Sequence, residues 1–405
     1  MINLETPKKF RALIDQAHQV AENVLRPISR KYDLAEHTYP KELDMLAAMI
    51  DGLEESGQSG GAGAAGVKGD PSSNGGGEGN RNGSNLSTVL SIIEMCWGDV
   101  GLTLALPRQG LGNAAIASVA TPEQQERFAG KWAAMAITEP EAGSDSAAIR
   151  TTAVLDGDEY VLNGEKIFVT SGDRADLLVV WATLDPSKGR AAIKSFVVDR
   201  HAPGVKLDRL EHKLGIRASD TANFVLDNVR VPKENLLGSP EIDTKKSFGG
   251  AMKTFDNTRP LVAAMALGVA RACIERTREL LAEAGVEVDY DRPASAQSGP
   301  AAELLDMEAD YEAALLITLE AAWMADNSKP NSLHASMAKA KAARTAVDIA
   351  MRCVELCGAT GYGEDELLEK WARDAKILDI FEGTQQIQLL IIARQLLGKS
   401  SAELR

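Results

Sequence analysis

The chain has 405 residues, of which 44% are hydrophobic and 25% charged, and its formal net charge is −14. This length allows two or three structural units with a large core, and the negative charge argues against nucleic acid or an anionic membrane surface as the main partner. No signal peptide and no apolar run long enough to span a bilayer occur, and the cysteines show neither disulfide nor zinc spacing. We therefore expect a cytoplasmic protein without a membrane span or a metal site. The cysteines are Cys96, Cys273, Cys353 and Cys357.

The first 55 residues are predicted to be helical. Phe10, Leu13 and Ala17 begin an apolar stripe at helical spacing, and a second helix passes through residues 43–49. Residues 56–85 are instead crowded with Gly, Ser and Asn and cannot bury a core, so they are predicted to form a long flexible insertion. A phosphate-binding loop is not expected there, because no strand leads into the segment and no Gly-Lys-Ser/Thr follows.

Helices are predicted to resume over residues 86–97 and 111–120. Thr121 then begins a further helix, because threonine is a good N-cap, Pro122 suits the first helical position, and a glutamine at the third completes a capping box. This helix, PEQQERFAGKW, is expected to close an N-terminal helical domain of residues 1–131.

The pattern changes to β from Met135. Two strand-like segments, 160–162 and 166–169, flank Asn163-Gly164, a pair that is typical of a type I′ hairpin turn. Turn residues separate the strands, which indicates a small β-barrel or sandwich over residues 132–240. Further strands are predicted over residues 177–184, 192–199, 204–210 and 223–231.

Helical periodicity returns from Lys245. Alanines at helix-neighbour spacing allow helices to approach closely, which predicts a four-helix bundle over residues 241–405. The expected fold class is therefore α+β and multi-domain, with a helical domain, a β-barrel and a helical bundle in that order. The predicted bundle helices cover residues 247–281, 301–327, 332–356, 365–381 and 385–397.

The last two predicted helices meet at the stretch KILDIFEGTQQIQ, residues 376–388. Gly383 can end one helix because glycine reaches left-handed conformations easily, and Thr384 can cap the next. Glu382 is thus placed at a helix–loop–helix corner beside apolar Phe381, where desolvation can raise its carboxyl pKa towards that of a general base. The backbone N–H groups that follow could polarise a carbonyl oxygen. Taken alone, the pattern also fits an ordinary loop glutamate.

Four motifs together resemble the acyl-CoA dehydrogenases: AITEPEAGSD at 136–145, KIFVTSG at 166–172, TFDNTRP at 254–260 and FEGTQQIQ at 381–388. The helix–barrel–helix order matches as well, and the resemblance covers nearly the whole chain except the glycine-rich insertion. It implies an oxidoreductase with FAD as cofactor, an acyl-CoA as substrate and an electron-transfer flavoprotein as electron acceptor. Fatty acid β-oxidation is the implied pathway, and straight-chain, branched and steroid side-chain thioesters all remain open.

The resemblance also implies a reaction. Glu382 would take the proton from the carbon α to the thioester carbonyl, while hydride leaves the β-carbon for flavin N5 and a trans-2-enoyl-CoA forms. The backbone N–H of Glu382 and a flavin ribityl hydroxyl would polarise the carbonyl, because that proton is otherwise too weakly acidic. Some family members carry the base at the position of Thr258, which cannot serve. An acyl-CoA oxidase and a non-catalytic partner subunit are the alternative readings.

Further site residues are implied by position in the motifs. Phe168 stands where many family members have tryptophan. Without the resemblance, Gly143-Ser144 would be a plain turn, Phe168 a strand core residue, and Asp256 with Arg259 a surface ion pair. The implied cofactor-binding residues are Met135, Ile137, Thr138, Gly143, Ser144, Phe168, Val169, Thr170, Thr384 and Gln386. The implied substrate-binding residues are Ser144, Asp256, Arg259 and Gly383.

The chain departs from the family where a neighbouring subunit usually completes the flavin site. Ala284 stands where an arginine is expected, Glu287 lies near an expected phenylalanine, and Glu355 replaces a glutamine. The loss of a cation together with two added carboxylates would repel a pyrophosphate. A tetramer is expected, and these departures raise the hypothesis of a mixed α2β2 tetramer in which a related chain donates the missing contacts. Local divergence with weaker flavin binding is the alternative.

Overall fold

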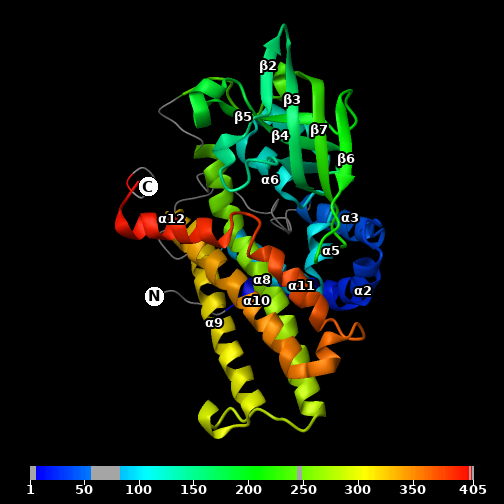
Figure 1. Cartoon of the computed structure of the whole chain (residues 1–405), viewed down its shortest axis with the longest axis vertical. Helices are drawn as coiled ribbons and strands as arrows, with labels where there is room; N and C mark the ends of the chain where they lie inside the picture. Colours follow the sequence, from blue (N-terminus) through cyan, green and yellow to red (C-terminus); the bar gives the residue numbers. More distant parts are fainter. Residues whose placement is uncertain (1–5, 56–82, 244–248, 401–402, 404–405) are drawn as a thin grey trace.

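The structure is a computed structural model that describes residues 6–55, 83–243, 249–400 and 403; for residues 53–55 and 249–257 it describes the backbone. Helices come first, a β-sheet follows, and long helices close the chain (Figure 1). The expected fold class is thereby confirmed, with the β part forming a half-barrel. The predicted insertion lies outside the described residues except for residues 83–85. Within the described chain, the helices include none with the length and apolar character needed to cross a membrane.

The N-terminal part is helical as predicted. Thr121 and Gln124 form the predicted capping box, but the helix they open ends at Arg127, earlier than expected. Helix α4 is nearly all buried, because it packs against the long helix α8 of the C-terminal part. The helices are α1 (Arg11–Val20), α2 (Arg26–Leu34), α3 (Glu42–Glu55), α4 (Ser84–Gly98), α5 (Val100–Leu104), α6 (Leu111–Val119) and α7 (Pro122–Arg127).

Seven strands form one sheet in the order β1-β4-β2-β3-β7-β6, with β5 paired to β4. Strands β3 and β7 are both long and pair antiparallel, and the aromatic rings of Tyr160, Phe196 and Phe224 fill the core that the sheet encloses. The strands are β1 (Ala133–Ala136), β2 (Thr152–Asp156), β3 (Glu159–Thr170), β4 (Leu177–Thr183), β5 (Ile193–Asp199), β6 (Val205–Leu210) and β7 (Thr221–Pro232).

The predicted hairpin turn at Asn163-Gly164 is wrong. Strand β3 runs straight through this pair, and its register against β7 shifts there, between Leu162 and Gly164. A Cβ on Gly164 would lie 2.3 Å from the hydroxyl oxygen of Thr151, so this position needs glycine for close approach rather than for a turn. The Asn-Gly signal therefore marks a β-bulge. The hairpin turn instead connects β2 to β3, at Gly157, which has a positive φ of 66°.

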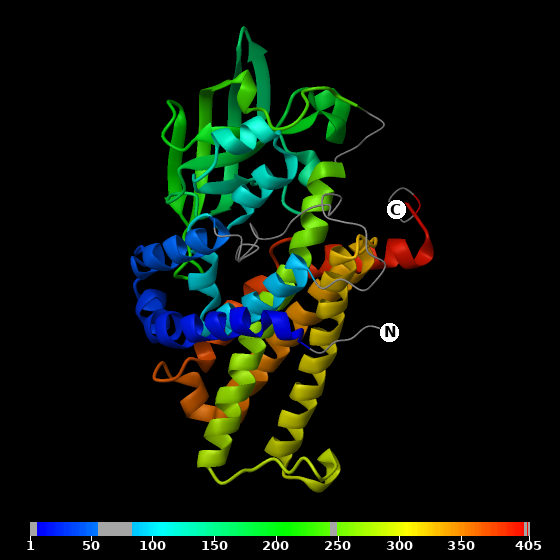
Figure 2. The same ribbon diagram turned by 180° about the vertical axis from the view of Figure 1, so that it is seen from behind.

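The C-terminal part consists of α8 (Gly249–Glu283), α9 (Gly299–Asp326), α10 (Ser332–Tyr362), α11 (Leu368–Leu378) and α12 (Gln385–Leu397). Small alanine side chains fill the space between α8, α9 and α10, as the sequence predicted. Helix α12 runs outward from the body of the molecule (Figures 1 and 2). Helix α8 begins at Gly249, close to the start at residue 247 that the sequence predicted, and Pro260 lies inside it.

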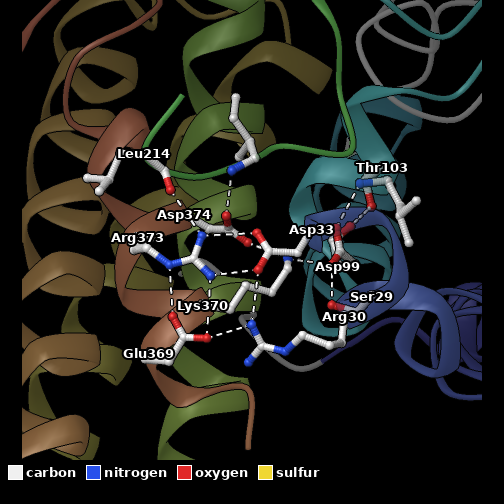
Figure 3. Close-up of polar contacts among 12 residues, drawn as sticks. Ser29, Arg30, Asp33, Asp99, Thr103, Leu214, Glu369, Lys370, Arg373 and Asp374 are labelled. Atoms are coloured by element: carbon white, nitrogen blue, oxygen red, sulfur yellow. Dashed lines mark hydrogen bonds and ion pairs between the residues drawn. The ribbon is translucent and has the colours of Figure 1, made fainter. Parts of the chain in front are cut away.

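The three parts meet at a buried charge network on α11 (Figure 3). Lys370 Nζ lies 2.6 Å from carboxylate oxygens of both Asp99, at the start of α5, and Asp374, on its own helix. All three side chains are almost fully buried. The two carboxylates raise the pKa of Lys370 against the opposing effect of burial, so its charge is retained.

Helix α11 also contacts the β part and α2 through this network. The backbone N–H of Ile216, between β6 and β7, donates to Asp374, and the Arg373 guanidinium binds Asp33 of α2 at 2.6 Å. Gly215 permits the approach, since a Cβ there would lie 2.5 Å from the backbone of Arg373. One helix is therefore tied to both other parts of the chain just before it leads into Glu382.

Candidate active site

Glu382 lies in the tight turn between α11 and α12. This turn lies near the level at which the sheet meets the helices (Figure 1). Glu382 and Gly383 both have left-handed backbones, with φ of 54° and 89°. For the glutamate this conformation is strained, and it persists only where surrounding contacts fix it. The hydroxyl of Thr384 accepts a hydrogen bond from Ile387 N–H and caps α12, as predicted.

The carbonyl oxygens of this turn are held from two helices. Gln388, fully buried on α12, donates from Nε2 to the carbonyls of Glu382 and Gly383 at 3.1 and 3.2 Å. Lys339, fully buried on α10, donates from Nζ to the Gly383 carbonyl at 2.7 Å. These contacts account for the persistence of the strained turn.

The carboxylate of Glu382 points towards α8. The hydroxyl of Thr258 donates to Glu382 Oε2 at 3.1 Å. Desolvation raises the carboxyl pKa above its ordinary value, although the Thr258 hydrogen bond and the positive charges of Arg259 and Lys339 act in the opposite direction. A raised pKa brings this carboxyl closer to the range in which a general base works at neutral pH.

The backbone of the turn offers one further group. Among the described residues, the N–H of Glu382 has no hydrogen-bond acceptor in the protein. It is therefore available to a ligand carbonyl beside the carboxylate. An N–H fixed in place before a ligand arrives can stabilise charge that develops on a carbonyl oxygen.

The implied substrate-side pair is described in part. Arg259 is buried, with 4% of its surface exposed, which argues against a surface ion pair at this position. The Asp256 side chain lies outside the part of the chain whose side chains are described. Arg259 nevertheless acts electrostatically on Glu382, so α8 and the turn share one site.

The loop of residues 138–145 is fixed to β3 by a buried ion pair. Lys166 Nζ lies 2.7 Å from Glu139 Oε1 and also donates to the carbonyl of Ile137 at 3.1 Å. Glu139 accepts hydrogen bonds from Arg150 N–H and Thr151 N–H. Burial opposes ionisation, but the Lys166 charge and these hydrogen bonds hold the pKa of Glu139 below its usual value.

Phe168 faces outward from the sheet. The register of β3 against β7 shifts between Lys166 and Val169, Phe168 has a positive φ of 57°, and 58% of its surface is exposed. The bulge therefore turns this ring out of the strand, which rules out the reading of Phe168 as a core residue. Thr138 lies close by, because its carbonyl accepts a hydrogen bond from Ile167 N–H at 2.9 Å.

The other implied cofactor residues differ in what they offer. Thr170 and Thr384 are half-buried, and the side chain of Val169 is buried in the barrel core, so it can offer only backbone contacts. Met135 and Ile137 pack against a small apolar cluster around Trp181. Gly143, Ser144 and Gln386 are exposed, and a Cβ on Gly143 would meet open space.

Glu382 contributes to neither of two further features. A cavity of about 590 Å³ lies between α9, α10 and α12, but Glu382 does not line it. Possible metal ligands gather at Glu36, His37 and His212, whose ligand atoms lie within 4.8 Å of one another. Glu36 is already bound there by His212 and by the backbone N–H of Lys213, which suits a contact between the N-terminal and β parts.

Sequence reasoning missed two buried lysines, Lys166 and Lys339, and it also missed Gln388. Lys166 lies inside one of the recognised motifs, and Gln388 ends another, but neither was assigned a role. Lys339 lies in an alanine-rich stretch of helix, where a charged side chain on the buried face is a signal for a specific partner.

Three family models match consecutive parts of the chain: the N-terminal domain of acyl-CoA dehydrogenase over residues 7–136, its middle domain over 134–229 and its C-terminal domain over 248–397. The structure is similar to butyryl-CoA dehydrogenase from Megasphaera elsdenii, with a TM-score of 0.83 and 31% identity over 98% of this chain and 100% of the other.

Curated relatives span almost the whole chain. The short-chain specific acyl-CoA dehydrogenase of Clostridium acetobutylicum is 34% identical over 93% of this chain and 94% of its own length. CarC, a subunit of the caffeyl-CoA reductase-Etf complex of Acetobacterium woodii, is 33% identical over 88% of this chain and 95% of its own. The chain belongs to the acyl-CoA dehydrogenase family, oxidoreductases that use FAD and act on acyl-CoA thioesters.

The residues present fit a flavin. The outward ring of Phe168 offers a flat apolar surface, half-buried Thr138 lies beside it, and open space adjoins Gly143. A planar aromatic cofactor can stack on such a ring. The buried Glu139–Lys166 pair fixes the loop and the strand that carry these residues relative to each other.

Proposed function

We propose that this chain catalyses the FAD-dependent α,β-dehydrogenation of an acyl-CoA thioester to the trans-2-enoyl-CoA, with Glu382 as the catalytic base. The observation that carries the proposal is the placement of Glu382. Its carboxyl has a raised pKa and is hydrogen-bonded to Thr258, and within the described part of the chain the N–H of the same residue has no acceptor and is available to a ligand.

The residues of the turn supply two complementary effects. The Glu382 carboxylate takes the proton from the carbon α to the thioester carbonyl. The Glu382 N–H donates to the thioester oxygen, which spreads the charge that develops as the proton leaves. Because both groups belong to one residue, the strained turn fixes their relative geometry. Arg259, with Ser144, Asp256 and Gly383, orients the acyl-CoA.

The cofactor would lie against the β part. When bound, FAD accepts the hydride from the β-carbon. Phe168 covers the ring while Thr138 and Thr170 offer hydroxyl or backbone contacts beside it. The remaining contacts come from Met135, Ile137, Gly143, Ser144, Val169, Thr384 and Gln386.

An electron-transfer flavoprotein is the proposed electron acceptor. Support comes from CarC, whose name places it in an Etf complex, and from a solved structure of the electron transferring flavoprotein of Acidaminococcus fermentans, to which this chain is similar with a TM-score of 0.82 and 32% identity. Because CarC is named as part of a reductase, assays should include reduction of the enoyl-CoA. An oxidase would instead consume oxygen during turnover, and this distinguishes the two acceptors.

A tetramer is proposed, and the mixed α2β2 assembly stays a hypothesis. Ala284 and Glu287 are exposed at and after the end of α8, and Glu355 pairs with Arg352 on the surface of α10 at 2.9 Å. None of them carries a cation that could bind a pyrophosphate. The number of flavins bound per chain, measured on the chain purified alone, distinguishes the two assemblies. One flavin per chain in a homotetramer would exclude the mixed assembly.

The test of the function compares the wild-type chain with Glu382→Gln on a panel of straight-chain, branched and steroid side-chain acyl-CoA thioesters. Glutamine keeps the shape of the side chain but cannot accept the proton. We expect normal flavin and acyl-CoA binding and a fall in kcat of at least about a thousandfold. Near-normal turnover by Glu382→Gln would exclude Glu382 as the base.

A further inference from the structure

Lys339 is a buried cation that contacts the turn of the proposed base without contacting its carboxylate. Its side chain has no exposed surface, and Nζ donates to the carbonyl of Gly383 at 2.7 Å. Placing a charged ammonium group in a helical core is costly unless partners compensate it. A methionine or leucine would suit the alanine-lined interior better, so the lysine calls for an explanation beyond packing.

The charges around Lys339 come from three elements. Asp379, after α11, and Glu382, in the turn, favour its charged form, whereas Arg259 on α8 disfavours it. Asp379 is itself shared, since Lys376 Nζ and an Arg344 guanidinium nitrogen lie 3.2 and 3.8 Å from its carboxylate. Burial dominates and lowers the pKa of Lys339 to about 8, which leaves the side chain mainly charged at pH 7.

We propose that Lys339 is a positioning residue for Glu382: its ammonium group holds the Gly383 carbonyl, fixes the left-handed turn and places a positive charge behind the carboxylate. This inference rests on the proposed function, because it concerns the same base. Lys339 touches neither substrate nor cofactor in this role and acts through the turn.

Two consequences follow from this arrangement. The positive charge limits how far desolvation raises the pKa of Glu382. Removing it therefore raises that pKa and shifts the acidic limb of the kcat profile to higher pH. An opposite charge at short range typically changes a carboxyl pKa by about one to three, so a shift of about one pH unit is expected. Below the limb, such a shift lowers kcat about tenfold.

The experiment compares Lys339→Met, Lys339→Gln and Lys339→Arg with wild-type holoenzyme. Lys341→Met is the matched control, because Lys341 lies on the same helix, is partly exposed and pairs with Asp310 at 2.6 Å. Thermal unfolding and flavin absorbance establish that each variant is folded and loaded. The kcat profile is measured from about pH 5.5 to about pH 9, and the carboxyl infrared band that Glu382→Gln abolishes is titrated independently of turnover.

We expect Lys339→Met and Lys339→Gln to shift the acidic limb of the kcat profile and the infrared titration of the Glu382 carboxyl to higher pH. Both measurements should stay close to wild type in Lys339→Arg and Lys341→Met. An unchanged limb in a folded neutral variant would overturn the proposal. So would failure of both neutral variants to fold, because Lys339 would then be a structural residue. Substantial turnover by Glu382→Gln in the same assays would instead overturn the proposed function with Glu382 as the base. Failure of the role of Lys339 can therefore be told apart from failure of the proposed function.

Discussion

The hydroxyl of Thr258 donates a hydrogen bond to Glu382 Oε2 across 124 positions of sequence. It joins the interior of α8 to the turn before α12. The two residues are the two positions at which family members are implied to carry the base. Their contact indicates that a carboxylate from either position would reach the same place, and it gives Thr258 a role that its lack of a carboxylate had concealed.

Thr258→Val should raise the pKa of the Glu382 carboxyl, because the hydroxyl stabilises only the charged form. A hydrogen bond to a charged group contributes about 1.5–3 kcal/mol, which corresponds to a shift of about one to two pH units. We expect kcat to fall at low pH and to recover at high pH. Thr318→Val is the control, since that hydroxyl is buried on α9 and bonds only to a backbone carbonyl. A profile unchanged from wild type would argue against the contact.

Gly383→Ala should lower both stability and turnover. The residue has φ of 89°, and a Cβ there would lie 2.5 Å from Nε2 of Gln388, which would be pushed off the turn. Gly398→Ala provides the comparison, because it also has a positive φ, of 62°, but meets open space. Strain alone costs about 1–2 kcal/mol. For Gly398→Ala we expect thermal unfolding to show that cost, with an unchanged kcat. For Gly383→Ala we expect a larger loss of stability and a reduced kcat. Equal effects of the two substitutions would contradict this expectation.

Glu139→Gln should destabilise the β part by about 3–5 kcal/mol, because it leaves the Lys166 charge buried without its partner. Burial already lowers the pKa of Lys166 to about 8 against the effect of Glu139. The double variant Glu139→Gln/Lys166→Met should regain most of the stability in denaturant unfolding. Asp227→Asn is the control, since its pair with Lys206 is exposed and should contribute less than about 1 kcal/mol. A double variant no more stable than the single one would refute the account.

Asp33→Asn should lower the melting temperature at pH 7, and this difference should shrink as the pH falls below about 3.9. Burial raises the carboxyl pKa, but the Arg373 hydrogen bond and the charges of Arg373, Lys370 and Arg30 outweigh it and leave the pKa of Asp33 lowered. A lowered folded-state pKa gives stability that is present above the unfolded value of about 3.9 and is lost as pH falls through the folded value. Asp156→Asn, at an exposed pair with Arg230, is the control. A constant difference at every pH would contradict this assignment.

Local patterns predicted most of the secondary structure. The capping box at Thr121, the helix cap at Thr384 and the alanine-rich helices were found because their signals lie within a few residues of each other. The prediction of a turn at Asn163-Gly164 was wrong because this dipeptide occurs both in hairpin turns and in β-bulges. Only the pairing of β3 with β7 distinguishes the two.

Glu382 and Phe168 were assigned to the candidate site from their motifs, and their roles stay predictions. The contacts that Thr258, Lys339 and Gln388 make with the turn join residues from different helices, which a linear pattern does not contain. Pro260 lies inside α8, in the interior of the helix that the sequence predicted, and the packed helix tolerates it.

The attachment of α11 to both other parts bears on how the chain can be recombined. Lys370 and Arg373 complement carboxylates that lie hundreds of positions earlier, and Asp374 receives a backbone group from the β part. Exchanging the last helices with those of a relative that lacks these cations would therefore leave Asp33 and Asp99 as unmatched buried charges unless they were exchanged as well. In a library of chimeric proteins, Asp33, Asp99, Lys370, Arg373 and Asp374 should all come from the same parent.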